Sequence, residues 1–173
     1  MSSSYSIQLS GLKEGHHTID FEIDKEFFEQ LEESEVKEGS LIANIEMDKR
    51  STHLDMIIRV SGSVSISCDR CLEMFSQPVN SENRLLVKFG KSIEDTDPDI
   101  LSIPADAFEL DLQQQIYEFI MLALPIKRVH PADKNGKSTC DPVMLKKLDE
   151  LIIEEEKETD PRWDELKKLM NDN

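Results

Sequence analysis

Residues 40–68 read SLIANIEMDKRSTHLDMIIRVSGSVSISC, and apolar residues alternate with polar ones through most of this stretch. The alternation forms three runs: Leu41, Ala43, Ile45 and Met47, then Met56, Ile58 and Val60, then Val64, Ile66 and Cys68. A period of two residues is typical of a strand with one buried face. The polar segment 48–53 predicts a turn after the first run, and Gly62 predicts a bend or bulge between the other two. The stretch therefore predicts an antiparallel meander.

The same alternation continues towards the N-terminus. It predicts two more strands, which carry Tyr5, Ile7 and Leu9, and then Ile19, Phe21 and Ile23. Asp24 follows the second strand and is placed to cap a short amphipathic helix. The apolar residues of that helix are Phe27, Phe28 and Leu31, and Gly39 is expected to end it.

The chain after the meander predicts one further strand and a hydrophobic helix. The strand carries Leu85, Val87 and Phe89. The helix follows a capping Asp111, ends at Pro125 and has an apolar face made of Leu112, Ile116, Phe119, Ile120 and Ala123. Because it is the most hydrophobic helix in the sequence, we expect it to lie across the sheet.

Two Asp-Pro pairs predict helices near the C-terminus, since Asp suits the N-cap and Pro suits the first helical position. Asp141-Pro142 starts a helix to about Lys157, and Asp160-Pro161 starts a short one through Trp163, Leu166 and Leu169. Residues 126–139 are polar and predict a loop. The fold class is therefore α+β: an antiparallel sheet covered by a hydrophobic helix in residues 1–140, with a helical extension of the same domain in residues 141–173.

Composition limits the partners and the compartment. The 173 residues include 20 Lys and Arg against 36 Asp and Glu, a net charge of −16. Such a field repels nucleic acid, so broad RNA binding is not expected, whereas a basic protein is a suitable partner. The same acidity also promotes solubility. Residues 1–12 show no signal peptide, the apolar run 119–125 is too short to cross a bilayer, and three cysteines make no disulfide framework. These features predict a cytoplasmic protein.

Cys68 and Cys71 have the spacing that lets two thiolates share one metal ion. His130 and Cys140, in the loop after the hydrophobic helix, are the best candidates to complete the set. Together the four residues predict a closed, structural zinc site. Asp141 is an alternative ligand if it does not cap a helix, and three cysteines packed as small apolar residues are the alternative without metal.

A redox use of the same cysteines is a second alternative. A Cys-x-x-Cys dithiol becomes reactive where a helix N-terminus lowers the pKa of its first thiol. Here strands flank the pair, and the charge of Asp69 is expected to raise the pKa of a neighbouring thiol. No phosphate-binding loop, nucleophile elbow or His-Glu-x-x-His motif is present in the sequence, so it does not indicate an enzyme.

Several blocks of sequence together resemble the YceD-like family. They are residues 60–64, Cys68-Asp69-Arg70-Cys71-Leu72-Glu73 with Phe75 and Pro78, residues 109–112 leading to 122–125, His130 and Cys140, and Asp160-Pro161-Arg162-Trp163 with Leu166. The resemblance covers about residues 40–173. Many family members carry further cysteines in the loop after the Leu-Pro element, where this chain has only His130 and Cys140.

The resemblance implies a role in large ribosomal subunit biogenesis and in the accumulation of its RNA, without known catalytic activity. Given the charge, we expect contact with a basic ribosomal protein or assembly factor more than with RNA directly. Arg70, Lys127 and Arg128 are basic residues in this otherwise acidic chain, and they are candidate partner-binding residues. The alternative is that they are ordinary surface charges without a binding role. Two rival functions remain open: a thiol enzyme using Cys68 and Cys71, and an acidic chaperone-like module without ribosomal specificity.

Overall fold

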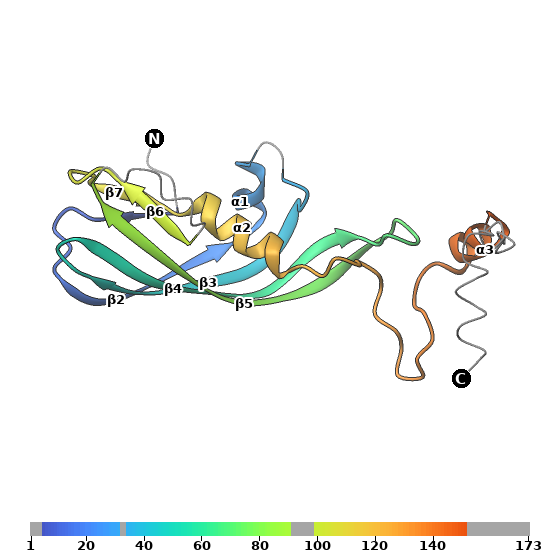
Figure 1. Cartoon of the computed structure of the whole chain (residues 1–173). Coiled ribbons are helices and arrows are strands. Elements are labelled where there is room, and N and C mark those ends of the chain that lie inside the picture. The colour runs from blue at the N-terminus through green and yellow to red at the C-terminus, as the bar shows by residue number, and fades with distance from the viewer. Residues whose placement is uncertain (1–4, 32–33, 91–98, 152–173) are drawn as a thin grey trace, which may run out of the picture.

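A long, twisted five-stranded sheet forms the framework of the protein (Figure 1). The computed structural model describes residues 5–31, 34–90 and 99–151. The strand order is β2-β3-β4-β5-β6, and a separate two-stranded sheet pairs β1 with β7. The elements are β1 (Ser6–Gln8), β2 (Gly15–Ile23), α1 (Lys25–Glu29), β3 (Glu38–Lys49), β4 (His53–Ser67), β5 (Met74–Phe89), β6 (Ile100–Ile103), β7 (Glu109–Asp111), α2 (Gln113–Ala123) and α3 (Pro142–Leu151).

Strands β2 to β5 form an antiparallel meander. The first predicted run is β3, but the second and third are one strand, β4, and β5 begins at Met74, well before the predicted run of Leu85, Val87 and Phe89. Past Ser65, where pairing with β3 ends, β4 and β5 continue as a short two-stranded arm (Figure 1). Strand β6 was not predicted, and it pairs with β5 in parallel through residues 86–89. The sheet is therefore mixed, although it is mostly antiparallel, and the predicted α+β class is confirmed.

One face of the sheet carries the hydrophobic core. The alternating residues Leu41 to Met47 and Leu54 to Val60 that face inward are at most 3% exposed. Helices α1 and α2 lie over this face (Figure 1), and α2 packs on β4 and β5 as the sequence predicted. The apolar faces of strands and helices thus meet in one core, as layered α+β folds require.

Helix α1 is shorter than predicted. Asp24 caps it as expected, since its Oδ1 accepts hydrogen bonds from the backbone N–H groups of Glu26 and Phe27. The prediction that Gly39 ends this helix is wrong, because Gly39 lies within β3. A Cβ at Gly39 would sit 3.0 Å from Cε2 of Phe28, so the glycine makes room for that buried ring.

Gly62 also has a role that differs from the predicted one. The β3–β4 and β4–β5 registers run unbroken through it, so β4 is one strand and no bulge divides it. Its φ is +145°, and a Cβ there would overlap the carbonyl oxygen of Ser40 and lie 2.7 Å from Cα of Leu41. Gly62 therefore allows β3 and β4 to approach each other closely opposite Leu41, before the arm begins.

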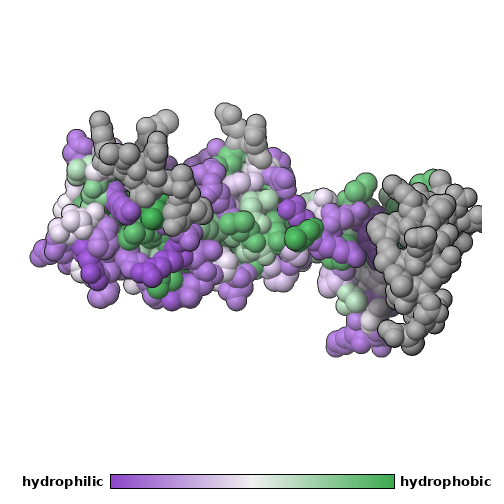
Figure 2. All heavy atoms as spheres, in the orientation of Figure 1, coloured by the Kyte–Doolittle hydropathy of each residue, from purple (hydrophilic) through white to green (hydrophobic). Residues whose placement is uncertain are grey.

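Helix α2 begins at Gln113, two residues after the predicted cap Asp111. Leu112 occupies the N-cap position, while the Asp111 carboxylate accepts a hydrogen bond from the backbone N–H of Gln113. The helix ends before Pro125, as predicted. Figure 2 shows apolar residues gathered near its C-terminal end, where Leu122 and Ile126 are exposed.

The third helix begins at the first Asp-Pro pair, as predicted. The carboxylate of Asp141 accepts a hydrogen bond from the backbone N–H of Val143, and α3 is described to Leu151. The predicted extension to Lys157 and the predicted helix at Asp160-Pro161 lie outside the described residues. No helix in the part of the chain that the structure describes is long and apolar enough to cross a membrane.

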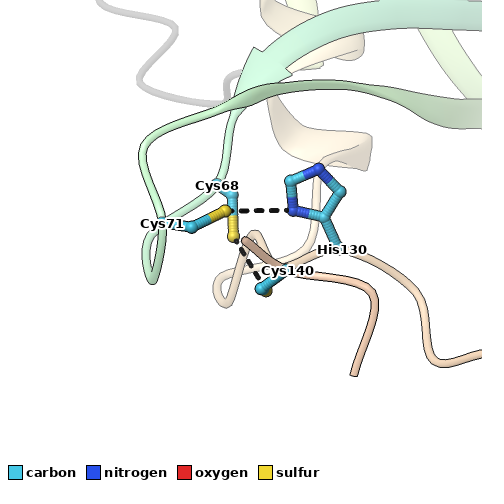
Figure 3. A group of neighbouring side chains, drawn as sticks. All are labelled: Cys68, Cys71, His130 and Cys140. Carbon is cyan, nitrogen blue, oxygen red and sulfur yellow. Dashed lines mark hydrogen bonds between the residues drawn. The ribbon is translucent and has the colours of Figure 1, made fainter. Parts of the chain in front are cut away.

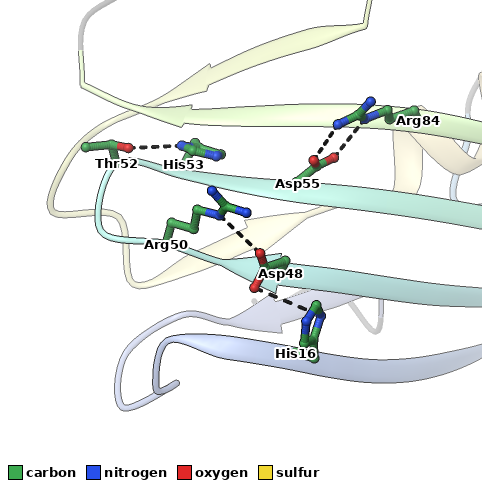
Figure 4. A network of polar contacts seen from close by, with 7 residues as sticks. All are labelled: His16, Asp48, Arg50, Thr52, His53, Asp55 and Arg84. Atoms are coloured by element: carbon green, nitrogen blue, oxygen red, sulfur yellow. Dashed lines mark hydrogen bonds and ion pairs between the residues drawn. The ribbon is translucent and has the colours of Figure 1, made fainter.

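The outer face of the sheet is polar and laced with ion pairs (Figure 4). Arg84 pairs with Asp55, and Asp48 lies between Arg50 and His16. Further along the face, Arg59 pairs with both Glu46 and Glu82. The hydrogen bond from Arg84 holds the pKa of Asp55 below its usual value. These pairs are largely exposed, so each contributes little stability, but they neutralise the arginines of this face.

We predict that Gly62→Ala lowers the free energy of unfolding by about 3 kcal/mol or more, because the new Cβ meets backbone that cannot move aside. Gly11→Ala is the control, since Gly11 has a φ of +82° but no neighbouring atom within 4 Å. It should cost only the conformational penalty of about 1–2 kcal/mol. Urea denaturation measures both, and equal losses would show that the close approach of β3 and β4 is not the cause.

Candidate metal centre

Residues 68–73 form a tight knuckle at the end of the β4–β5 arm. The backbone N–H of Cys68 donates to the carbonyl of Glu73 (2.9 Å), and that of Leu72 donates to the carbonyl of Cys68 (2.9 Å). Leu72 adopts a left-handed conformation, with φ of 62°, which is costly for a residue with a side chain. The cysteines thus lie at a reversal between strands, as predicted.

The segment after α2 is tied to this knuckle by two short hydrogen bonds. The backbone N–H of Asp69 donates to the carbonyl of Arg128 (2.7 Å), and the N–H of Arg128 donates to Oδ2 of Asp69 (2.7 Å). We call this reciprocal pair the Asp69–Arg128 clamp. It holds the chain beside the knuckle two residues before His130, so the histidine ring faces the cysteines.

A small hairpin, residues 131–139, then returns the chain to the same place. Ala132 and Ser138 form an antiparallel bridge, and the hydroxyl of Thr139 donates to the carbonyl of Pro131 (2.7 Å). At the turn, the Asp133 carboxylate accepts hydrogen bonds from the backbone N–H groups of Asn135 and Lys137. The hairpin therefore brings Cys140 back to the knuckle directly after it.

The four predicted ligands meet at one point (Figure 3). The sulfur atoms of Cys68 and Cys140 are 3.7 Å apart, and the Cys71 sulfur is 3.4 Å from Nδ1 of His130. All four candidate ligand atoms lie within 4.8 Å of one another. Four ligands held tetrahedrally around zinc, at about 2.3 Å for sulfur and about 2.1 Å for nitrogen, are roughly 3.5–3.8 Å apart. The cluster therefore has nearly the size that such a centre needs and could hold a metal ion.

The three sulfur atoms of the cluster are buried from solvent, and the histidine is partly buried. Cys68, Cys71 and Cys140 are 0%, 3% and 5% exposed, and His130 is half-buried. The ring of Phe75, at the start of β5, packs against the His130 ring with centroids 4.8 Å apart. Sequence reasoning assigned Phe75 no role here, although alternation along β5 would have placed it on the inner face. This packing fixes the orientation of the His130 ring, and a histidine that binds a metal needs a fixed orientation.

The two cysteines of the knuckle have opposite pKa shifts. Burial raises the pKa of Cys68, but hydrogen bonds from surrounding backbone N–H groups outweigh it and lower the pKa to about 6. The donors are the backbone N–H groups of Cys71, Arg70 and His130. Burial raises the pKa of Cys71, as do the neighbouring sulfurs of Cys68 and Cys140. The knuckle backbone thus favours a thiolate at Cys68, which is the form that binds metal.

The expectation that the charge of Asp69 raises the pKa of a neighbouring thiol is wrong for Cys68. Its carboxylate is engaged by the backbone of Arg128, and the pKa of Cys68 is lowered. A lowered pKa at Cys68 would favour both metal binding and redox chemistry, so it does not distinguish between these two uses. Burial separates the two uses, because a reactive cysteine must be reached by its substrate and Cys68 is 0% exposed. The arrangement is better suited to a closed centre than to thiol exchange.

The remaining predicted site residues are placed as follows. Arg70 and Lys127 are exposed, whereas the guanidinium of Arg128 pairs with Glu35 at 2.9 Å. Contact of these residues with a partner stays a prediction. The side chain of Asp141 caps α3, so its carboxylate is occupied and is not needed as a ligand.

A comparison of the sequence with known protein families identifies the family of this chain. The family model described as large ribosomal RNA subunit accumulation protein YceD matches residues 56–170. The match covers the β4–β5 arm, its knuckle and the loop that returns to it, and it spans more than half of the chain. No curated protein and no solved structure matches the chain significantly. The chain belongs to the family of the large ribosomal RNA subunit accumulation protein YceD.

Proposed function

We propose that this protein is a non-enzymatic factor that supports large ribosomal subunit biogenesis and the accumulation of large-subunit RNA. The observation that carries the proposal is the family match over residues 56–170, since that family is described by its effect on this RNA. The proposed mode of action is binding to a basic ribosomal protein or assembly factor. Its proposed compartment is the cytoplasm, where large-subunit precursors are available.

The charge of the outer sheet face supports a basic protein partner. The carboxylates of this face outnumber its basic groups: Asp20, Glu22, Glu38, Glu46, Asp48, Asp55 and Glu82 stand against Arg50, Arg59, Arg84 and Lys88. The face therefore keeps a net negative charge, and its three arginines are already paired with carboxylates. The face is not flat: a shallow depression of about 440 Å³ lies between Glu46, Asp55 and Arg84. Complementary charge would speed the association with a basic protein.

The proposed cofactor is one structural zinc ion held by Cys68, Cys71, His130 and Cys140. Three sulfur ligands and one nitrogen suit zinc, and four protein ligands leave no position for a substrate. When bound, the ion would link the knuckle of the arm to the loop between α2 and α3. A linking role of this kind supports an adaptor, and it gives no reason to assign catalysis.

We predict about one zinc per chain in the purified protein and loss of that zinc in Cys140→Ser, because a serine hydroxyl is a poor substitute for a thiolate ligand. His16→Ala is the control, since that histidine lies on the outer face and its side chain is 91% exposed. Elemental analysis measures the content. A metal-free wild type that is equally stable with and without a chelator would end the zinc proposal.

Depletion of the protein should lower the amount of large-subunit RNA relative to small-subunit RNA, and wild-type protein should restore it. The purified chain should also sediment with large-subunit precursors, with less bound as salt is raised. Gradient profiles and RNA quantification measure both effects. Unchanged subunit ratios after depletion would contradict the proposed function.

Removing charge from the outer face should weaken this cosedimentation. Asp20→Asn combined with Glu22→Gln removes two exposed carboxylates of β2, and we expect a several-fold loss of bound protein. Asp106→Asn combined with Glu118→Gln is the matched control, because both residues are exposed but lie away from the outer sheet face. Equal losses in the two double variants would mean that total charge matters and that the face does not.

A further inference from the structure

The segment that supplies the last two metal ligands differs in charge from the rest of this acidic chain. Residues 126–140 carry Lys127, Arg128, Lys134 and Lys137 but only one carboxylate, Asp133. That carboxylate accepts two backbone hydrogen bonds within its own turn. By contrast, residues 99–125 contain acidic residues and no lysine or arginine. The basic residues are thus concentrated at the loop beside the knuckle.

Most of these basic residues have no acidic partner. On the sheet, Arg50, Arg59 and Arg84 are each paired with carboxylates. Near the knuckle, Arg128 pairs with Glu35. Among the described residues, no ion pair is formed by Arg70, Lys127, Lys134 or Lys137, and all four are exposed. Their charge is available to a ligand from outside.

Arg70 and the hairpin 131–139 line the same depression. Its volume is about 340 Å³, and it lies between Arg70 on the knuckle and Pro131, Gly136 and Ser138 on the hairpin, with His130 at its base. Lys137 stands between Gly136 and Ser138, and Lys134 occupies the turn of the hairpin. Figure 2 shows a hydrophilic surface at this hairpin. Arg70 therefore lines the hollow, and Lys134 and Lys137 belong to the hairpin that forms its other wall.

The arm separates this hollow from the acidic face of the sheet. Ser67, at the end of β4, follows Arg59 by eight residues, which is roughly 26 Å of strand at about 3.3 Å per residue. The screening length in physiological salt is about 8 Å. Nearer carboxylates are Asp69, held by the clamp, Asp133, hydrogen-bonded within its own turn, and the exposed Glu73 and Glu38, the latter opposite Ser65. A phosphate at the hollow is thus screened from most of the acidic charge of the sheet.

We propose that Arg70, Lys134 and Lys137, with Lys127 beside them, form a contact surface for the phosphate backbone of RNA. A planar guanidinium lining the hollow and exposed ammonium groups on the adjoining hairpin suit phosphate oxygens. RNA fits better than an acidic protein because it offers phosphates at regular spacing to several cations at once. Such a surface does not distinguish one RNA base sequence from another, and it gives a weak, salt-dependent contact. The identification of this RNA as ribosomal rests on the proposed function. The proposed contact with RNA phosphates does not depend on that function.

The test is fluorescence anisotropy of a labelled oligouridine with the full chain. Wild type should bind with an affinity that falls as salt rises, with a log–log slope of about −2, as expected for three phosphates on a single strand. The triple variant Arg70→Gln, Lys134→Gln, Lys137→Gln should bind about tenfold more weakly, with a slope near zero. Lys13→Gln, Lys25→Gln, Arg50→Gln removes the same charge elsewhere and should bind within twofold of wild type. Unchanged metal content and circular dichroism would show that the variants fold.

Three results would overturn the proposal. They are absence of salt-dependent binding by wild type, equal weakening in both triple variants, and displacement of the RNA by polyglutamate as efficiently as by unlabelled RNA. The last would identify an acidic protein as the partner class. A wild type that restores large-subunit RNA in depleted cells but binds no oligouridine would refute this inference alone. Failure to restore that RNA would refute the proposed function whatever the oligouridine shows.

Discussion

The Asp69–Arg128 clamp is the contact on which the arrangement of the candidate site depends. A two-stranded arm projecting from a sheet has little core of its own, and a polar loop of this length is costly to order. One backbone–backbone hydrogen bond and one backbone–carboxylate hydrogen bond, each of 2.7 Å, join the arm to the loop, and they place His130 and then Cys140 against the cysteine knuckle. A metal ion in this cluster would reinforce a contact that the backbone already makes, so ion and clamp would stabilise the same junction.

The junction also separates two surfaces of opposite character. The sheet presents a face whose arginines are neutralised by carboxylates and whose remaining charge is negative. The loop at the far end of the arm presents basic side chains without acidic partners among the described residues. A protein built in this way could hold a basic ribosomal protein on one surface and touch RNA with the other. The net charge of −16 describes the average and conceals this division.

Much of the fold could be predicted because it depends on local patterns. The period of two residues identified β3, β4 and β5, and Asp24 and Asp141 identified two helix starts. The four ligand residues were predicted from cysteine spacing and loop position, and the structure brings them together. What failed depended on contacts between distant segments. Gly39 was read as a helix end although it accommodates Phe28, and Asp69 was read as a charge near a thiol although it binds the backbone of Arg128.

The central claim is that the four residues hold one zinc ion that joins the arm to the loop. Extended X-ray absorption at the zinc edge of the purified protein tests it most directly, because the method reports which atoms bind the ion. The account predicts three sulfur ligands at about 2.3 Å and one histidine nitrogen at about 2.1 Å, with no bound water. A first shell dominated by oxygen, or a protein that holds no zinc after purification without chelators, would contradict it.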